Sequence, residues 1–204
     1  MILVGRVGSP YVRRTAILLD VIGIEFENSA LSAMTDQEEL RGINPLGRVP
    51  ALIDGKTVLV DSVAIALTLL DRHDPVGALW PRGGPAMAEA LQALFIANGA
   101  LDKFVASYYE RTRRPLELVH PPWRAHCEGQ AHGGLDELER QFARLRPGAE
   151  AGPAPDYLDI VLATMITFMT SVDADFIDAA RYPRLVDWSS RCEKLPAFLR
   201  RKPG

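Results

Sequence analysis

The sequence is short of cysteine and of long apolar runs. Of its 204 residues only Cys127 and Cys192 are cysteines, and their wide separation matches no metal-binding or redox spacing. Two buried, unbridged thiols in a reducing compartment are therefore expected. No apolar run approaches the roughly 18 residues that a membrane-spanning helix needs, and the N-terminus has no signal-peptide pattern. These features predict a cytoplasmic protein that works without a membrane.

A strong excess of either charge is also missing. Lys and Arg total 23 against 26 for Asp and Glu, which gives a net charge of −3. A dedicated nucleic-acid binder carries a marked basic excess, so no nucleic-acid partner is expected. Hydrophobic residues make up 48% and charged residues 24%, a composition typical of a globular protein. A chain of this length can form one large domain or two small ones.

The first part of the chain alternates between strand and helix patterns. Apolar runs and apolar–polar alternation predict the strands, and apolar residues at helical spacing predict the helices between them. In chain order we expect a strand at 1–4, a helix from Ser9-Pro10 to Gly23, a strand at 24–28, a short helix at 36–41 stopped by Gly42, strands at 51–53 and 57–60, and a helix opened by Asp61-Ser62. This βαβαββα order predicts a four-stranded mixed sheet flanked by helices.

The two longer helices of this part are predicted to be amphipathic. The apolar side of the first one comprises Val12, Ala16, Leu19 and Ile22, with Arg13, Arg14 and Asp20 between them. The apolar side of the last one comprises Ala64, Ile65, Leu67 and Leu70.

Ser9-Pro10 has the composition of a helix start. Serine can cap the free amides of the first turn, and proline suits the first helical position because its missing N–H had no partner there. A strand that runs into this helix leaves Ser9 beside unpaired N–H groups and the positive end of the helix dipole, a place that favours an anion. A plain helix cap is the alternative interpretation of Ser9, and this segment alone does not decide between the two.

From residue 75 onward the composition changes. Prolines and glycines crowd into residues 75–84, which predicts a linker between a domain at 1–74 and a domain at 85–204. Beyond the linker, apolar residues recur only at helical spacing, so the second domain is expected to be all-helical. The expected elements are a helix at 87–113, a helix at 123–145 with a break left open at Gly133-Gly134, a loop at 147–155, an apolar central helix at 156–169, and a short helix at 184–191 followed by a stop at Leu195-Pro196.

Asp156 and Asp159 stand at the start of the predicted central helix. Asp156 can cap the helix, and Asp159 can accept a hydrogen bond from the amide of the capping residue. A catalytic carboxylate pair is the alternative, but no partner residue lies nearby in the sequence. We interpret the pair as a structural capping box.

Three short motifs of the first domain occur together: Ser9-Pro10-Tyr11 at the first strand–helix junction, Val49-Pro50 before the third strand, and Asp61-Ser62 at the start of the third helix. With the run from Asn44 to Leu52, this set resembles the glutathione transferase superfamily over the whole chain. The Ser-Pro-Tyr start followed by Arg14 is similar to bacterial serine-type members with an omega/zeta-like N-terminal motif. The resemblance implies an α/β thioredoxin-like N-terminal domain, an all-α helical-bundle C-terminal domain, and a homodimer.

The resemblance also implies glutathione as co-substrate, without a metal. Val49, before a cis Pro50, would pair its backbone with the cysteinyl part of glutathione. Asp61 and Ser62 would hold the γ-glutamyl group, although Asp61 is one methylene shorter than the commoner Glu or Gln, and a plain helix cap is the alternative for this pair. Ser9 would donate a hydrogen bond to the glutathione thiolate and so lower the pKa of the thiol, without being a nucleophile itself.

The site for a second, small electrophilic substrate is harder to place. By resemblance, the long helix at 87–113 faces the cleft, so the candidates for lining that site are Tyr11, Phe104, Tyr108 and Arg111. Aromatic residues at helical spacing more often belong to the core, and that alternative stays open. The basic patch of Arg111, Arg113 and Arg114 is assigned no role, because a solvated helix end is the plainer account.

Three functions are compatible with these motifs. The favoured one is a glutathione transferase whose thiolate attacks an apolar electrophile, as in detoxification. The second is glutathione-dependent isomerisation or dehalogenation of a small acid by means of the same Ser9. The third is a non-catalytic, glutathione-transferase-like partner-binding protein, against which the retained Ser9, Val49-Pro50 and Ser62 argue. Serine in the place where omega-like members have cysteine argues against thiol–disulfide reduction.

Overall fold

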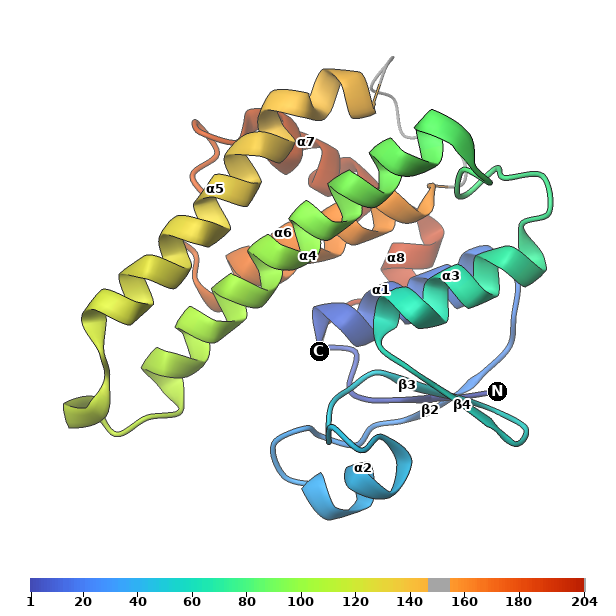
Figure 1. Ribbon diagram of the computed structural model, residues 1–204, viewed down its shortest axis with the longest axis horizontal. Coiled ribbons are helices and arrows are strands. Elements are labelled where there is room, and N and C mark those ends of the chain that lie inside the picture. Colours follow the sequence, from blue (N-terminus) through green and yellow to red (C-terminus); the bar gives the residue numbers. More distant parts are fainter. Residues whose placement is uncertain (147–154, 204) are drawn as a thin grey trace. The chain divides into compact units, whose positions relative to one another are not determined.

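The computed structural model describes residues 1–146 and 155–203, which form two compact units (Figure 1). The described residues of the first unit are 1–82, 155–160 and 191–203, and those of the second are 83–146 and 161–190. The loop predicted at 147–155 lies, apart from Pro155, outside the described residues. The functional division into a glutathione-binding domain at 1–74 and a helical domain at 85–204 stays a prediction.

The described residues of the first unit contain a four-stranded mixed sheet, as expected. Its order is β2-β1-β3-β4, with β1 parallel to β2 and the other neighbours antiparallel. The strands are β1 (Ile2–Val4), β2 (Glu27–Ser29), β3 (Ala51–Asp54) and β4 (Thr57–Val60). The strand predicted at 24–28 was misplaced, because the short β1 pairs only with Glu27–Ser29.

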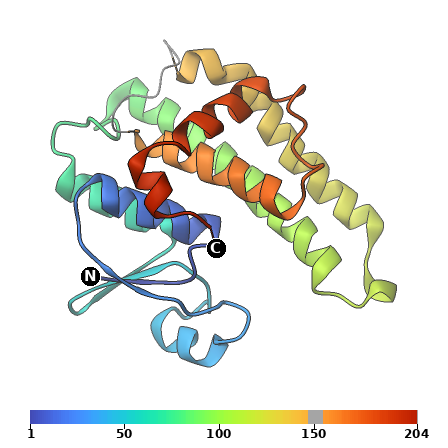
Figure 2. The same ribbon diagram turned by 180° about the vertical axis from the view of Figure 1, so that it is seen from behind.

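Helices cover both faces of this sheet. The helices are α1 (Pro10–Val21), α2 (Gln37–Ile43) and α3 (Ser62–His73). Helices α1 and α3 lie side by side over one face, and α2 lies on the other (Figures 1 and 2). Side chains alternate between the two faces of a strand. Val4 and Ala51, directly opposite each other, accordingly form a core with Leu40 of α2.

Two details of these helices were predicted wrongly. Helix α2 passes through Gly42 and ends at Ile43, because the helix cannot easily include Asn44, the residue before Pro45. The buried stripe of α3 is offset from the predicted one: Ala64 is exposed and Leu67 half-buried. The buried apolar residues of α3 are Ile65, Ala66, Leu69 and Leu70.

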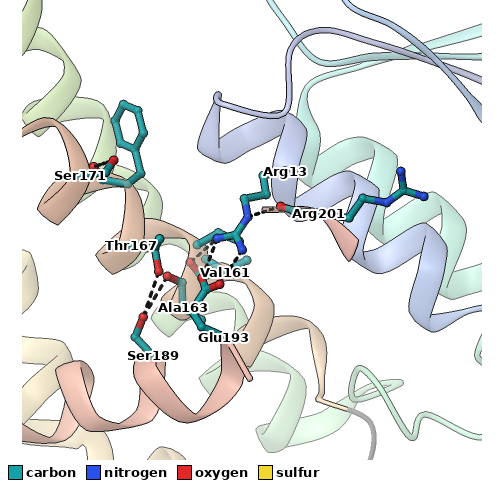
Figure 3. Close-up of polar contacts among 10 residues, drawn as sticks. Arg13, Val161, Ala163, Thr167, Ser171, Ser189, Glu193 and Arg201 are labelled. Atoms are coloured by element: carbon teal, nitrogen blue, oxygen red, sulfur yellow. Dashed lines mark hydrogen bonds and ion pairs between the residues drawn. The ribbon is translucent and has the colours of Figure 1, made fainter. Parts of the chain in front are cut away.

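The C-terminal residues of the first unit are bound to α1 (Figure 3). Arg13 is 2% exposed, not on a solvated polar face as its spacing suggested. Its Nη1 and Nη2 donate to the two carboxylate oxygens of Glu193 at 2.6 Å each, and its Nε donates to the Arg201 carbonyl oxygen at 2.7 Å. The Arg201 guanidinium donates twice to the Asp20 carboxylate at 2.8 Å. Two charge-assisted pairs therefore hold this segment against α1.

The remaining elements are helical, as expected. They are α4 (Gly84–Thr112), the 3₁₀ turn η1 (Leu116–Leu118), α5 (Pro121–Leu145), α6 (Tyr157–Val172), α7 (Pro183–Cys192) and α8 (Pro196–Arg200). Helix α5 runs through Gly133-Gly134 without the break that the sequence left open. Helix α7 ends before Leu195-Pro196, as predicted, but it is not the last helix, because Pro196 occupies the first turn of α8, where its missing N–H is tolerated.

Local predictions for the second half of the chain are confirmed at two places. The Asp156 amide donates to Asp159 Oδ2 at 3.1 Å, and the Asp159 amide donates to Asp156 Oδ1 at 2.8 Å, which is the reciprocal capping box. Cys127 and Cys192 are buried, and neither forms a disulfide within the described ranges. No helix among the described residues has the length and apolarity to cross a membrane.

Candidate functional site

The register of the sheet brings the three predicted glutathione motifs to the same end of its strands. Val4, at the end of β1, pairs with Ala51, at the start of β3. Ala51 also pairs with Val60, at the end of β4. Three segments therefore meet the sheet at this one row of paired residues. They are the chain that leads to Ser9, the Val49-Pro50 bond and the Asp61-Ser62 junction.

Two tight contacts confirm this convergence. Gly5, directly after β1, has φ +130°, and a Cβ placed there would lie 2.9 Å from Val49 Cβ. Glycine is therefore required where the loop to Ser9 passes Val49. On the other side, Arg14 Nη2 of α1 donates to Ser62 Oγ of α3 at 2.5 Å.

Ser9 stands at the N-cap position of α1, directly before Pro10. It is half-buried, with φ −74° and ψ 128°, and its carbonyl oxygen accepts from the Arg13 amide at 2.8 Å. In the part of the chain that the structure describes, its hydroxyl makes no capping hydrogen bond to the helix. The side-chain cap considered in the sequence is therefore not formed, and the hydroxyl remains available to a ligand.

The Val49-Pro50 peptide bond is cis, and Val49 is half-buried. The loop before it is organised by Asn44, a buried residue that the sequence reasoning did not single out. Asn44 Nδ2 donates to the Arg48 carbonyl oxygen at 2.8 Å, and Asn44 Oδ1 accepts from the Leu46 amide at 3.0 Å. The run from Asn44 to Leu52 marked this segment by resemblance, but only the fold shows that the Asn44 side chain bonds the backbone at both Leu46 and Arg48.

Asp61 and Ser62 start α3 with different roles. Asp61 has φ 68°, an uncommon backbone conformation for a residue other than glycine, and its Oδ1 accepts from the Val63 amide at 2.8 Å. Asp61 is therefore the helix cap, and Ser62 is the first helical residue, 1% exposed. Strained backbone of this kind is often found at binding sites.

Charged and polar groups surround Ser62. Arg14 is 2% exposed and lies with its guanidinium 5.0 Å from the centre of the Tyr11 ring. Tyr157 Oη donates to the Ser62 carbonyl oxygen at 3.4 Å. Burial raises the pKa of Tyr157; the nearby Arg14 charge acts in the opposite direction, and the Asp61 charge adds to the increase. The sequence reasoning placed Arg14 on the polar side of the first helix and used it as a family marker, but Arg14 is buried beside Ser62.

The candidate residues for the electrophile site fall in both units. Tyr11 is half-buried in the first unit, next to Arg14. Phe104 is buried in the second unit, with its ring centre 4.6 Å from that of Phe176. Tyr108 stacks on Phe104 at 6.5 Å, and the Arg111 guanidinium lies 5.9 Å from the Tyr108 ring centre. Phe104 thus belongs to an aromatic core, and an electrophile site lined by these residues stays a prediction.

The basic patch at the end of α4 is paired with acidic and aromatic groups. Arg111 forms an ion pair with Asp173 at 3.0 Å, and Arg114 forms one with Glu110 at 2.8 Å. Arg113 lies over the Tyr109 ring, 5.7 Å from its centre. Within the described residues, no group of three or more His, Cys, Asp or Glu side chains is placed to hold a metal ion.

Comparison with known proteins agrees with this geometry. The family model for the glutathione S-transferase N-terminal domain matches residues 3–77, and the model for the C-terminal domain matches residues 121–191. A glutathione S-transferase of Triticum aestivum is 28% identical over 193 residues, covering 91% of this chain and 84% of the relative. A zeta-class glutathione S-transferase of Euphorbia esula is 26% identical over 198 residues, covering 93% and 84%.

Among solved structures, a glutathione transferase family member from Pseudomonas fluorescens Pf-5 with bound glutathione is similar throughout. It is 28% identical, with a TM-score of 0.87, and the likeness covers 100% of this chain and 98% of that one. Both domain models, the relatives and the fold agree that this chain belongs to the glutathione S-transferase family.

Proposed function

We propose that the protein is a glutathione transferase. It binds glutathione at the end of the sheet where the three motifs meet, and it directs the glutathione thiolate at a small apolar electrophile. The observation that carries this proposal is the position of Ser9, whose hydroxyl stands at the start of α1 without capping it within the described structure. The Pseudomonas fluorescens family member, with its bound glutathione, supports glutathione as the ligand. A cytoplasmic homodimer is part of the same proposal.

The proposed mechanism needs no general base. A thiol has a pKa near 8.5, so only a small fraction is thiolate at neutral pH. A hydrogen bond from the Ser9 hydroxyl, next to the amides of the first turn of α1, stabilises the sulfur anion and lowers the thiol pKa. Each unit of that lowering corresponds to about 1.4 kcal/mol. The proton goes to solvent, the sulfur forms a bond to the electrophilic carbon, and the leaving group departs with the electron pair.

The rest of the site would bind and orient the tripeptide. The backbone of Val49 pairs with the cysteinyl residue, as an added strand pairs with a sheet edge. The first-turn amides of α3 and the Ser62 hydroxyl receive the γ-glutamyl carboxylate. Asp61 uses Oδ1 as the helix cap, so its Oδ2 is the oxygen that would face the ligand's ammonium.

The decisive experiment is an ultraviolet titration of the thiolate in the complex with glutathione, for the wild type and for Ser9→Ala. We expect the variant to bind glutathione with little loss, because the γ-glutamyl and backbone contacts remain, while the pKa of the bound thiol rises toward that of free glutathione. Since Ser9 makes no side-chain cap, the unfolding free energy should fall by less than the roughly 1 kcal/mol usual for a lost cap. Equal thiol pKa values in the two proteins would contradict the proposed role.

Glutathione-dependent isomerisation or dehalogenation of a small acid is the second candidate, because the same Ser9 hydroxyl at the start of α1 would activate glutathione for it. The two functions differ in the fate of glutathione. A transferase consumes one thiol for each turnover, whereas an isomerase regenerates it. Thiol counting during turnover of each substrate class therefore separates them. A stable thiol concentration during conversion of an unsaturated acid would favour the isomerase.

A further inference from the structure

Two consecutive arginines of α1 are buried to the same extent and point to different partners. Arg13 and Arg14 are each 2% exposed. Arg13 is bound by Glu193 and by the Arg201 carbonyl group (Figure 3). Arg14 donates from Nη2 to Ser62 Oγ at 2.5 Å. A charged side chain is rarely buried so completely unless its surroundings compensate the lost hydration, so the position of each guanidinium is a specific feature of the fold.

The contact with Arg14 restricts what the Ser62 hydroxyl can do. A serine hydroxyl has one proton to donate and two lone pairs, whereas a guanidinium has five donors and no acceptor. Ser62 Oγ can therefore only accept from Arg14, and its own proton must point elsewhere. Arg14 thus holds Ser62 as a donor at the start of α3, which is the arrangement that recognises an anion.

The charge of Arg14 acts in the same direction. The first turn of α3 presents its amides and the positive end of the helix dipole. Asp61 works against an anion there, because its carboxylate caps the Val63 amide. The two charges have opposite effects on the pKa of Tyr157: Arg14 lowers it and Asp61 raises it. Arg14 offsets the negative charge of the cap and keeps the site suited to a carboxylate.

We propose that Arg14 is a positioning residue that makes this site select ligands with a free carboxylate on the γ-linked N-terminal residue. The inference rests on the proposed function, because it assumes that glutathione binds at Ser62. It goes further by assigning the discrimination to a buried residue of α1, one that acts through Ser62 without contacting the ligand.

The test compares two ligands by calorimetric titration. One is glutathione; the other is 4-aminobutanoyl-cysteinylglycine, which lacks only the α-carboxylate of the γ-glutamyl residue. We expect the wild type to prefer glutathione, and Arg14→Met to lose glutathione affinity about tenfold or more while its affinity for the analogue stays within about twofold. Ser62→Ala should remove the same preference, and adding it to Arg14→Met should cost little more, because the two residues act as one unit.

Arg13→Met is the matched control, since it removes an equally buried arginine one position away. It should lower stability without changing the ratio of the two affinities. If either methionine variant fails to fold, Arg14→Gln and Arg13→Gln give the same comparison, because glutamine is polar but uncharged, and its acceptor oxygen no longer forces Ser62 Oγ to be the acceptor.

The outcomes separate this inference from the proposed function. A wild type that binds neither ligand overturns both. A wild type that binds both ligands equally leaves glutathione binding intact and overturns the role of Arg14. A preference that persists in the Arg14 variants, or that disappears equally in the Arg13 variants, also overturns it.

Discussion

Gly134 lies on the face of α5 that packs against α4. A Cβ at this position would lie 2.9 Å from Ala100 Cβ and 3.4 Å from the Ile96 carbonyl oxygen. Real Cβ contacts are longer than the first of these distances, so the two helices approach as closely as they do because position 134 has no side chain. The adjacent Gly133 is exposed, and a Cβ there would meet nothing within 4 Å.

The two glycines should respond to alanine with opposite signs. Gly134→Ala should destabilise the protein by about 1–3 kcal/mol, because the added methyl group overpacks a tight helix contact. Gly133→Ala should stabilise it by about 0.5–1 kcal/mol, because alanine loses less backbone entropy than glycine in a helix. Denaturant unfolding of both variants measures the difference. Equal effects would mean that α5 does not pack against α4 through position 134.

Residue-level properties that depend on distant partners were the hardest to predict. Arg13 and Arg14 have the spacing of a polar face, and nothing local distinguishes them from solvated arginines. Glu193, the partner of Arg13, lies 180 positions away in the sequence. The burial of both arginines follows from tertiary contacts, which hydrophobic periodicity does not contain. The Asp156–Asp159 capping box was predictable because both of its hydrogen bonds are local.

At the scale of elements, α5 is joined to the segment before α7 by a polar and aromatic cluster. His132 Nδ1 lies 2.9 Å from Tyr182 Oη, and the His132 ring stacks on Phe176 with 4.3 Å between ring centres. Arg181 donates twice to the Asp136 carboxylate, at 2.9 and 2.7 Å. Burial raises the pKa of Tyr182 to about 12, so its hydroxyl keeps its proton and can donate to a neutral His132.

This cluster should make stability depend on pH. Burial and the Arg181 charge lower the pKa of His132 from 6.5, although the Asp136 and Glu128 charges oppose the shift. Below pH 6.5, His132 is therefore protonated more readily in the unfolded chain than in the folded protein. The unfolding free energy should fall as the pH drops through 6.5 toward the pKa of His132 in the folded protein. Unfolding at pH 7.5 and pH 5 should show a smaller acid loss for His132→Phe than for the wild type.

His126→Phe is the control for this comparison, because it removes an exposed histidine of the same helix. If the His132 and His126 variants lose the same stability between the two pH values, the cluster does not couple protonation to folding.

The order and type of the longer elements could be predicted, whereas several of their limits could not. Proline illustrates why. Pro196 can end one helix or begin the next, and the choice of α8 depends on burying Phe198, which the sequence alone does not reveal. The first and last residues of β2 are set by the length of its partner strand β1. The motifs at Ser9, Val49-Pro50 and Asp61-Ser62 were predictable because each is a short local run that resembles a known family, and the sheet register then brings their segments to one end of the strands.

At the scale of the whole molecule, the untested expectation is the homodimer that the family resemblance implies. Phe95 offers a place to examine it, because it is 59% exposed on α4 while the adjacent Leu94 is fully buried. Burial of one such side chain contributes about 1.5–3 kcal/mol to the free energy of dimer formation. In a two-fold symmetric dimer this contribution occurs twice, once from each chain. A large exposed aromatic residue of this kind is the type of anchor that dominates interface energies.

We therefore expect the wild type to have twice the chain mass of 22.4 kDa in solution, and Phe95→Glu to weaken the dimer by two orders of magnitude or more in Kd. Light scattering over a dilution series measures both. Leu116→Glu is the control, since Leu116 is also exposed and apolar but lies in the turn after α4. It should leave the mass unchanged. A wild type with the mass of a single chain would refute the dimer. If Phe95→Glu and Leu116→Glu weaken the dimer equally, the effect comes from the added charge and not from the loss of Phe95 at the interface.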